Sequence, residues 1–231
     1  YGEVDTTSLG FTGISRLGGL VREEYIADLR GVEMVTAYTR MRADGTVQSM
    51  LTSLMMPILA AAWAVEPCDD SPNGLAGADL VQETLLEAST LSVPWEQILR
   101  DCLTAIIYGF SVGALQWGVR GGRAALTAII PLHPKTLLSS PSWSFGERGE
   151  LLGVTQSGMD GLIWRSEFIP RERMLHVCLG SEFGNPEGQS VLRGGYKHWL
   201  IKDKLYLWSA IGQQRTQVGI PILKYATANR A

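Results

Sequence analysis

Apolar residues recur with a helical period through the first half of the chain. After a Gly-, Ser- and Thr-rich opening over residues 1–18, helically spaced apolar positions run from Leu20 to Tyr38 and from Val47 to Met56. The residues between them, 43–46, are turn formers. Pro57 is expected to disturb or end the second helix. The pattern therefore predicts an N-terminal arm followed by two helices.

The next segment combines an irregular stretch with two more helical patterns. Residues 62–67 can form a short extended segment, and the composition of 68–77 predicts a loop. A helical pattern spans 75–91. Another begins after Pro94, a residue that fits the first turn of a helix, and Gly109 is its expected stop. These patterns predict a mainly helical first half.

Beyond Gly109 the pattern changes to extended runs. Two such runs, 111–119 and 124–132, flank a Gly-Gly turn, which predicts a β-hairpin that ends at His133-Pro134. Short strands are predicted further along, and residues 180–188 are predicted to form a loop. The predicted strands are 142–145, 151–156, 161–164 and 174–178.

A long helical pattern follows from about Gln189 to about Gln217, before Gly219-Ile220-Pro221. At 1.5 Å per residue such a helix is roughly 40 Å long. The order of helices, a small sheet and one long helix predicts an α+β fold with a projecting element.

The surface of this long helix is unusual. On a helical projection, Lys197, Lys204 and Arg215 fall within about 40° of Arg193, which places the four cations on one stripe. Apolar and aromatic residues occupy most of the remaining circumference, although a surface helix normally has a broad polar face. We therefore predict that copies of this helix pack against one another between subunits, through Tyr196, Trp199, Leu205, Tyr206, Trp208 and Ile211.

Charge divides at the same helix. Residues 190–231 hold seven Lys or Arg and one Asp, or about +6, which leaves about −9 for residues 1–189 of a chain whose net charge is −3. This asymmetry indicates a surface for a polyanion or an acidic partner. The alternative is that the cationic side chains simply lie over the aromatic rings and extend their charged ends to water.

Composition excludes several classes. The chain has 231 residues, of which 45% are hydrophobic and 19% are charged. This composition excludes a disordered chain and a globally basic nucleic-acid binder. The low fraction of charged residues favours a subunit of a larger assembly. The three cysteines show no metal-binding or disulfide spacing, which predicts an intracellular, reduced protein. No signal peptide is visible, and the longest apolar run, 103–119, is interrupted by Gly, Ser and Gln, so no membrane span is predicted.

The sequence lacks recognisable catalytic motifs. There is no phosphate-binding loop, no HExxH and no GxSxG. His133, His176 and His198 are isolated, so each is predicted to be structural. The sequence thus predicts no catalytic residue, no metal and no cofactor. One alternative hypothesis is an enzyme whose active site lies in the 111–179 sheet region. It requires a pocket with converging polar groups around His133 or His176.

Several runs together resemble the portal proteins of tailed bacteriophages. Their order and spacing over some 185 residues carry the resemblance. Ala114 departs from it, since many relatives have an acidic residue there. The matching runs are Tyr38-x-x-Met41-x-x-Asp44-Gly45-x-Val47, residues 57–67 (PILAAAWAVEP), 105–112 (AIIYGFSV) with Leu115-Gln116-Trp117, 130–134 (IPLHP), 188–193 (GQSVLR), 196–199 (YKHW) with Lys202, and 218–221 (VGIP).

The resemblance implies a ring of about twelve subunits at one capsid vertex, through which double-stranded DNA is packaged and ejected. Residues 19–188 would form the wing, 189–218 the stem helix and 219–231 the start of the clip. Relatives continue well beyond this point, so we expect the chain to be part of a longer subunit. The implied partners are other copies of the chain, the DNA, the major capsid protein, the terminase and head-tail adaptor proteins. The implied location is the virion, after assembly in the host cytoplasm.

Two questions stay open at this stage. The cations Arg193, Lys197, Lys204 and Arg215 are expected to face either the DNA channel or a neighbour's acidic wing. The competing function is a monomeric polyanion or nucleic-acid binding module that uses the basic C-terminal helix.

Overall fold

A computed structural model describes residues 26–87, 91–120, 122–138, 142–147, 149–160, 162–217 and 219. The predicted arm (1–18) and nearly all of the predicted clip segment (219–231) lie outside the described residues. The chain divides into two compact units, one ending at Arg193 and one beginning at Gly194.

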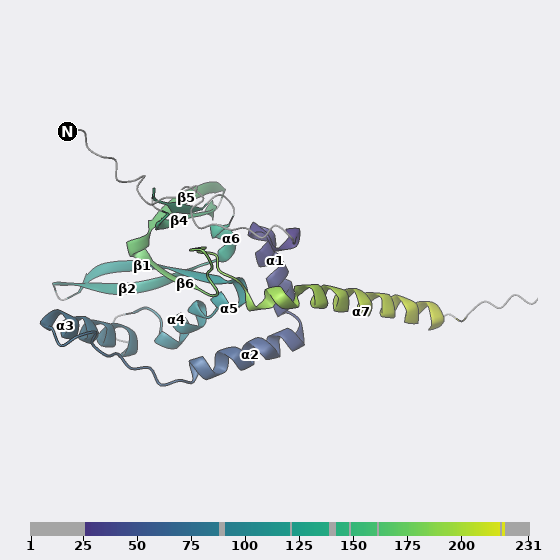
Figure 1. The fold of residues 1–231 in the computed structure, drawn as a ribbon, viewed down its shortest axis with the longest axis horizontal. Coiled ribbons are helices and arrows are strands. Elements are labelled where there is room, and N and C mark those ends of the chain that lie inside the picture. Colours follow the sequence, from purple (N-terminus) through teal and green to yellow (C-terminus); the bar gives the residue numbers. More distant parts are fainter. Residues whose placement is uncertain are drawn as a thin grey trace, which may run out of the picture. The chain divides into compact units, whose positions relative to one another are not determined.

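The first unit mixes short helices with two small antiparallel sheets, and the second contains one long helix, as the α+β prediction expected (Figure 1). The helices are η2 (Ala27–Leu29), α1 (Gly31–Arg42), α2 (Gly45–Leu59), α3 (Pro72–Val81), the π-helix η3 (Gln82–Leu86), α4 (Trp95–Cys102), α5 (Ala105–Tyr108), α6 (Pro134–Leu137), η4 (Arg171–Arg173), η5 (Val191–Gly195) and α7 (Tyr196–Gln217). The strands are β1 (Phe110–Arg120), β2 (Arg123–Leu132), β3 (Trp143–Phe145), β4 (Leu151–Asp160), β5 (Ile163–Pro170) and β6 (Met174–Cys178).

The predicted turn between α1 and α2 is confirmed. The Asp44 carboxylate caps α2 by accepting hydrogen bonds from the backbone N–H groups of Thr46 and Val47, at 2.9 and 3.4 Å. Pro57 does not end this helix, because it lies in the last turn and the helix continues to Leu59.

The prediction of a loop over 68–77 is wrong. Helix α3 begins at Pro72, because Ser71 Oγ caps it by accepting from Gly74 N at 3.0 Å and Pro72 suits the first helical position. The helical segment then passes into η3 and stops at Leu86, short of the predicted residue 91. Residues 62–67 have no regular secondary structure.

The predicted hairpin is confirmed as β1 and β2, in a register that places Val112 opposite Leu132. Strand β6 pairs with the other edge of β1, which gives the order β2-β1-β6. The second sheet has the order β3-β4-β5. Strands β4 and β5 extend beyond the predicted 151–156 and 161–164, because Ser157 and Ser166 continue the pairing at their centre.

One buried cluster of the first unit lies between the two sheets, and further buried apolar residues, among them Met41, Leu51 and Ile107, lie on the helices. Phe110, Val112 and Met174 from the first sheet pack with Val154 of β4 and with Leu137 of α6. Figure 1 shows α3 and α4 along the opposite side of the β2-β1-β6 sheet. This sheet therefore has one face in the core and a second face turned towards helices.

The long helix starts later than predicted. Residues 189–192 are tied to the first unit, because Gln189 N donates to Leu179 O at 2.7 Å and Ser190 Oγ donates to Ile107 O at 2.5 Å. A 3₁₀ turn, η5, follows and ends in Gly194-Gly195, which are poor helix formers. The regular helix therefore begins at Tyr196 rather than at Gln189.

A substitution at Gly109 tests the close backbone packing at the end of α5. Gly109 ends α5 in a left-handed conformation with φ +90°, and an added Cβ would lie 2.6 Å from Glu187 O. We expect Gly109→Ala to lower the free energy of unfolding by on the order of 2 kcal/mol, since the side chain meets both strain and backbone. Gly77→Ala is the control, because nothing lies within 4 Å of its Cβ position. Urea denaturation of both variants should show the difference, and equal midpoints would contradict it.

Candidate subunit-contact surfaces

Helix α7 exposes apolar side chains in several directions. At about 100° per residue, Leu205 points roughly opposite to Leu207, while Tyr206 and Trp208 point about 160° apart. In the single chain Tyr206 is 65% exposed and Trp208 is 62% exposed, and Ile201, Leu205, Leu207 and Ile211 are exposed as well. Exposed apolar surface of this extent marks a contact site.

The first turn of α7 is more buried than its later turns. Tyr196 is buried and Trp199 is half-buried, with ring centroids 6.1 Å apart. Further along, Lys202 Nζ lies 5.5 Å from the centre of the Tyr206 ring, a cation–π geometry. Of the six residues predicted to pack between subunits, Leu205, Tyr206, Trp208 and Ile211 are thus the ones left exposed.

Three of the four predicted cations share a stripe. Helix α7 is continuous, so Lys197, Lys204 and Arg215 fall within about 20° of one another, and all three are exposed. We call these three residues the cation stripe. The helical projection does not extend to the fourth cation, Arg193, because it lies in η5 and in the first unit.

A large apolar pocket lies in the first unit, between the helices and the outer face of the β2-β1-β6 sheet. Its volume is about 540 Å³. Leu115 and Trp117 of β1 form part of its floor, and Leu99 of α4 and Leu85 of η3 form part of its wall. Thr84 and Cys102 are the polar side chains among the residues that line it.

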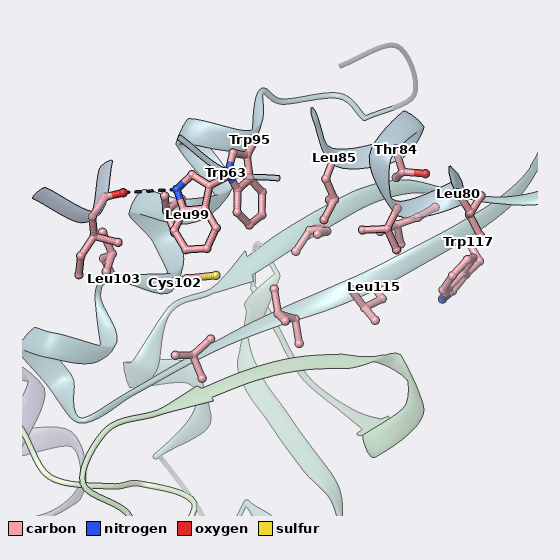
Figure 2. A pocket seen from close by; sticks show the side chains of 16 residues that line it. Trp63, Leu80, Thr84, Leu85, Trp95, Leu99, Cys102, Leu103, Leu115 and Trp117 are labelled. Atoms are coloured by element: carbon pink, nitrogen blue, oxygen red, sulfur yellow. Dashed lines mark hydrogen bonds between the residues drawn. The ribbon is translucent and has the colours of Figure 1, made fainter. Parts of the chain in front are cut away.

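Tryptophan residues mark both ends of this pocket (Figure 2). At one end the Trp63 and Trp95 rings pack edge to face, with centroids 5.7 Å apart. Trp63 Nε1 donates to Ile58 O at 3.3 Å, whereas Trp95 Nε1 is buried without a hydrogen-bond partner among the described residues. At the other end Trp117 is 51% exposed. A pocket of this kind lacks the converging polar groups of a catalytic site.

The outer end of the β4–β5 hairpin is a third exposed apolar surface. Leu162 is 96% exposed, and Met159, Ile163 and Trp164 around it are exposed too. Hairpin ends are normally polar, so these side chains also favour a contact with another molecule.

His133 and His176, the two histidines around which an active site was considered, do not line the pocket. His133 is exposed, and its Nδ1 accepts from Lys135 N at 3.2 Å, which caps α6. His176 packs against Trp143, with ring centroids 5.3 Å apart, and its Nε2 lies 2.8 Å from Pro186 O. Since a carbonyl only accepts, Nε2 carries the proton. Both histidines have local structural roles.

In the described part of the chain, no group of three or more His, Cys, Asp and Glu side chains is placed to hold a metal ion. No helix in that part has the length and apolar character needed to cross a membrane.

A family model described as the portal protein of Mu bacteriophage matches residues 35–231, most of the chain. The chain belongs to this portal family. The resemblance inferred from the sequence is thereby confirmed, and the portal protein is a bacteriophage head-tail connector and a component of the virion. The family is structural rather than enzymatic.

Two surfaces of this portal protein were missed by sequence reasoning. The pocket is built from Trp63, Trp95 and Trp117, residues that are distant along the chain and carry no common motif. The hairpin end was missed because the two strands that form it were predicted to be shorter than they are. An Asp-Gly turn at 160–161 followed directly by Leu-Ile-Trp was the available signal.

The pH dependence of stability tests the role of His176 in the portal protein. Burial, helped by the charge of Arg171, holds the pKa of His176 below its usual 6.5, although the hydrogen bond to Pro186 opposes this shift. Below about pH 6.5 the unfolded chain takes up a proton that the folded chain resists, so the free energy of unfolding should fall with pH there. We expect His176→Gln, which keeps a donor, to show a shallower fall between pH 7 and 5 in urea denaturation. An unchanged slope would count against this role.

Proposed function

We propose that this chain is a subunit of a closed ring of about twelve copies at one capsid vertex, through which double-stranded DNA is packaged and later ejected. The observation that carries the proposal is the exposure of apolar side chains in several directions on α7. A helix of this kind needs neighbours on more than one side, and a ring supplies two of them for every copy. Membership of the portal family supports the same assembly.

Within the ring, residues 19–188 serve as the wing, 189–218 as the stem and 219–231 as the start of the clip. Neighbouring stems contact each other through apolar side chains that are exposed in the single chain, namely Leu205, Tyr206, Trp208 and Ile211. Burying one large apolar side chain contributes about 1.5–3 kcal/mol. Several such side chains, repeated at each interface, make the ring more stable than separate subunits.

DNA passage sets a second requirement. Each tight cation–phosphate contact would have to break at every step of translocation, and such contacts are strongly salt-dependent. Helix α7 carries the three widely spaced members of the cation stripe together with Lys202, not a dense basic patch. This sparse charge suits a passive conduit, while the terminase motor, the major capsid protein and the head-tail adaptors act as separate partners.

The mass of the assembled full-length protein tests the ring. Native mass spectrometry or electron microscopy should show a closed ring of about a dozen copies. A monomer with strong, salt-dependent DNA binding would overturn the proposal in favour of the polyanion-binding alternative.

Two substitutions in α7 test its role directly. We expect Leu205→Glu with Trp208→Glu to abolish ring formation and to leave a folded subunit, because both side chains are exposed in the single chain. Gln213→Glu with Gln214→Glu adds the same charge at exposed polar positions of the same helix, and rings should persist. Size-exclusion chromatography with light scattering separates the outcomes, and rings in both variants would contradict the assignment of α7 as the stem contact.

A further inference from the structure

The apolar side chains of α7 gather on two opposite faces, when each residue advances about 100° around the helix axis. The first contact face is a sector of about 120°, and its apolar members are Ile201, Leu205, Trp208 and Ile211. The second contact face is narrower and is centred on the opposite side of the helix, and its apolar members are Trp199, Tyr206 and Ala210. The helix therefore offers two different surfaces for contact.

A third sector of α7 carries no apolar side chain. We call it the polar sector, and its members are His198, Lys202, Ser209, Gln213 and Thr216. It spans about 60° and separates the two contact faces on one side of the helix. The side roughly opposite carries Leu200 and Leu207. The polar sector is thus the side of α7 best suited to face water.

Charge distinguishes the two contact faces. The cation stripe lies within the first face, since Lys197, Lys204 and Arg215 share the sector of Trp208. The second face is bordered by Asp203, the one carboxylate of α7. Lys204 and Asp203 both lie towards the margin of their face that is away from the polar sector. In parallel copies of the helix they differ in height by only about 1.5 Å, so the two faces are complementary in charge.

Side-chain size is complementary as well. Trp208 lies at the centre of the first face and Ala210 near the centre of the second, and both are exposed. They are about 3 Å apart along the axis, so the large ring on one helix can cover the small residue on a parallel neighbour. Leu205 and Tyr206, also exposed, occupy the facing margins beside the polar sector.

We propose that the first contact face of each α7 packs against the second contact face of α7 in a neighbouring copy, with Trp208 over Ala210 and Lys204 beside Asp203. This contact rests on the ring proposed above and names the partner of each face. Because the two faces differ, the contact is heterologous, the type that closes into rings. The polar sector then faces the lumen, since a channel for hydrated DNA requires a polar wall. The cation stripe faces the neighbouring helix and not the DNA.

A disulfide experiment on the full-length protein tests this contact. Gly212 lies on the first face and Ala210 on the second, about 160° apart on one helix, so a disulfide within the chain is excluded. Both residues are exposed, and nothing lies within 4 Å of a Cβ added at Gly212. In a Cys68→Ser background, which removes the exposed native thiol, Ala210→Cys with Gly212→Cys should give a ladder of covalent multimers on a non-reducing gel.

The matched control is Gln214→Cys with Thr216→Cys, which has the same spacing at exposed positions outside both contact faces and should give no ladder. Ring mass is measured for the variant and for its Cys68→Ser background. Rings in both samples without a ladder overturn this contact and leave the proposed function standing, whereas a background protein without rings contradicts the proposed function. Covalent dimers from Ala210→Cys alone also overturn the contact, because they place two second faces together.

A charge exchange tests the same contact without cysteines. Lys204→Glu faces Asp203 with a second carboxylate and Asp203→Lys faces Lys204 with a second cation, so each should raise the protein concentration required for assembly about tenfold. Both substitutions in one chain should restore assembly, because opposite charges meet again. Gln213→Glu, in the polar sector, should assemble normally. A double variant that assembles no better than the single variants would refute the pairing.

The orientation of the polar sector is tested in DNA-filled particles. A photo-reactive residue that replaces Ser209 should form an adduct with DNA on irradiation, because this position faces the lumen. The same residue in place of Leu207, which points about 160° away, should form none. The absence of an adduct at position 209, or an adduct at position 207, would overturn the proposed orientation.

Discussion

The structure depends on the cost of leaving apolar surface in water. Only 19% of the residues are charged, and the interior of the single chain does not take in all of its large apolar side chains. As a result the single chain exposes a pocket with three tryptophans, an aromatic hairpin end and a helix with apolar residues in several directions. These surfaces become stable only when they are covered. In the proposed ring, assembly completes the burial that folding of one chain begins.

Local patterns in the sequence were enough to predict most elements. Asp44 before α2, Pro94 before α4 and the Gly-Gly turn between β1 and β2 act within a few residues, so the hairpin and helices followed from short windows. The late start of α7 was missed because tertiary hydrogen bonds compete with helix formation there. The contact between Ser190 and Ile107, 83 residues apart, holds the chain away from a helical path and delays the start of α7. No local pattern reports such a contact.

The candidate surfaces also differ in whether the sequence alone could predict them. The exposed character of α7 could be inferred from its helical projection, because one continuous segment carries all of its residues. The pocket could not be inferred, since it needs the sheet order β2-β1-β6 and the placement of α3, η3 and α4 beside it. Arg193 was grouped with the cation stripe because a helix was assumed to run through Gly194-Gly195. The helical projection does not extend to Arg193, because the regular helix begins at Tyr196.

The attachment of residues 189–192 has a mechanical consequence. In the proposed ring, any force that a moving duplex exerts on α7 passes along the backbone to Ser190 and Gln189. The Ser190 hydroxyl is hydrogen-bonded to Ile107, and the Gln189 N–H is hydrogen-bonded to Leu179, the residue after β6. Strand β6 is paired in turn with β1 in the middle of the sheet. In that ring, a pull along the helix would act on these hydrogen bonds and through them on the pairing of β6 with β1, as well as on the backbone.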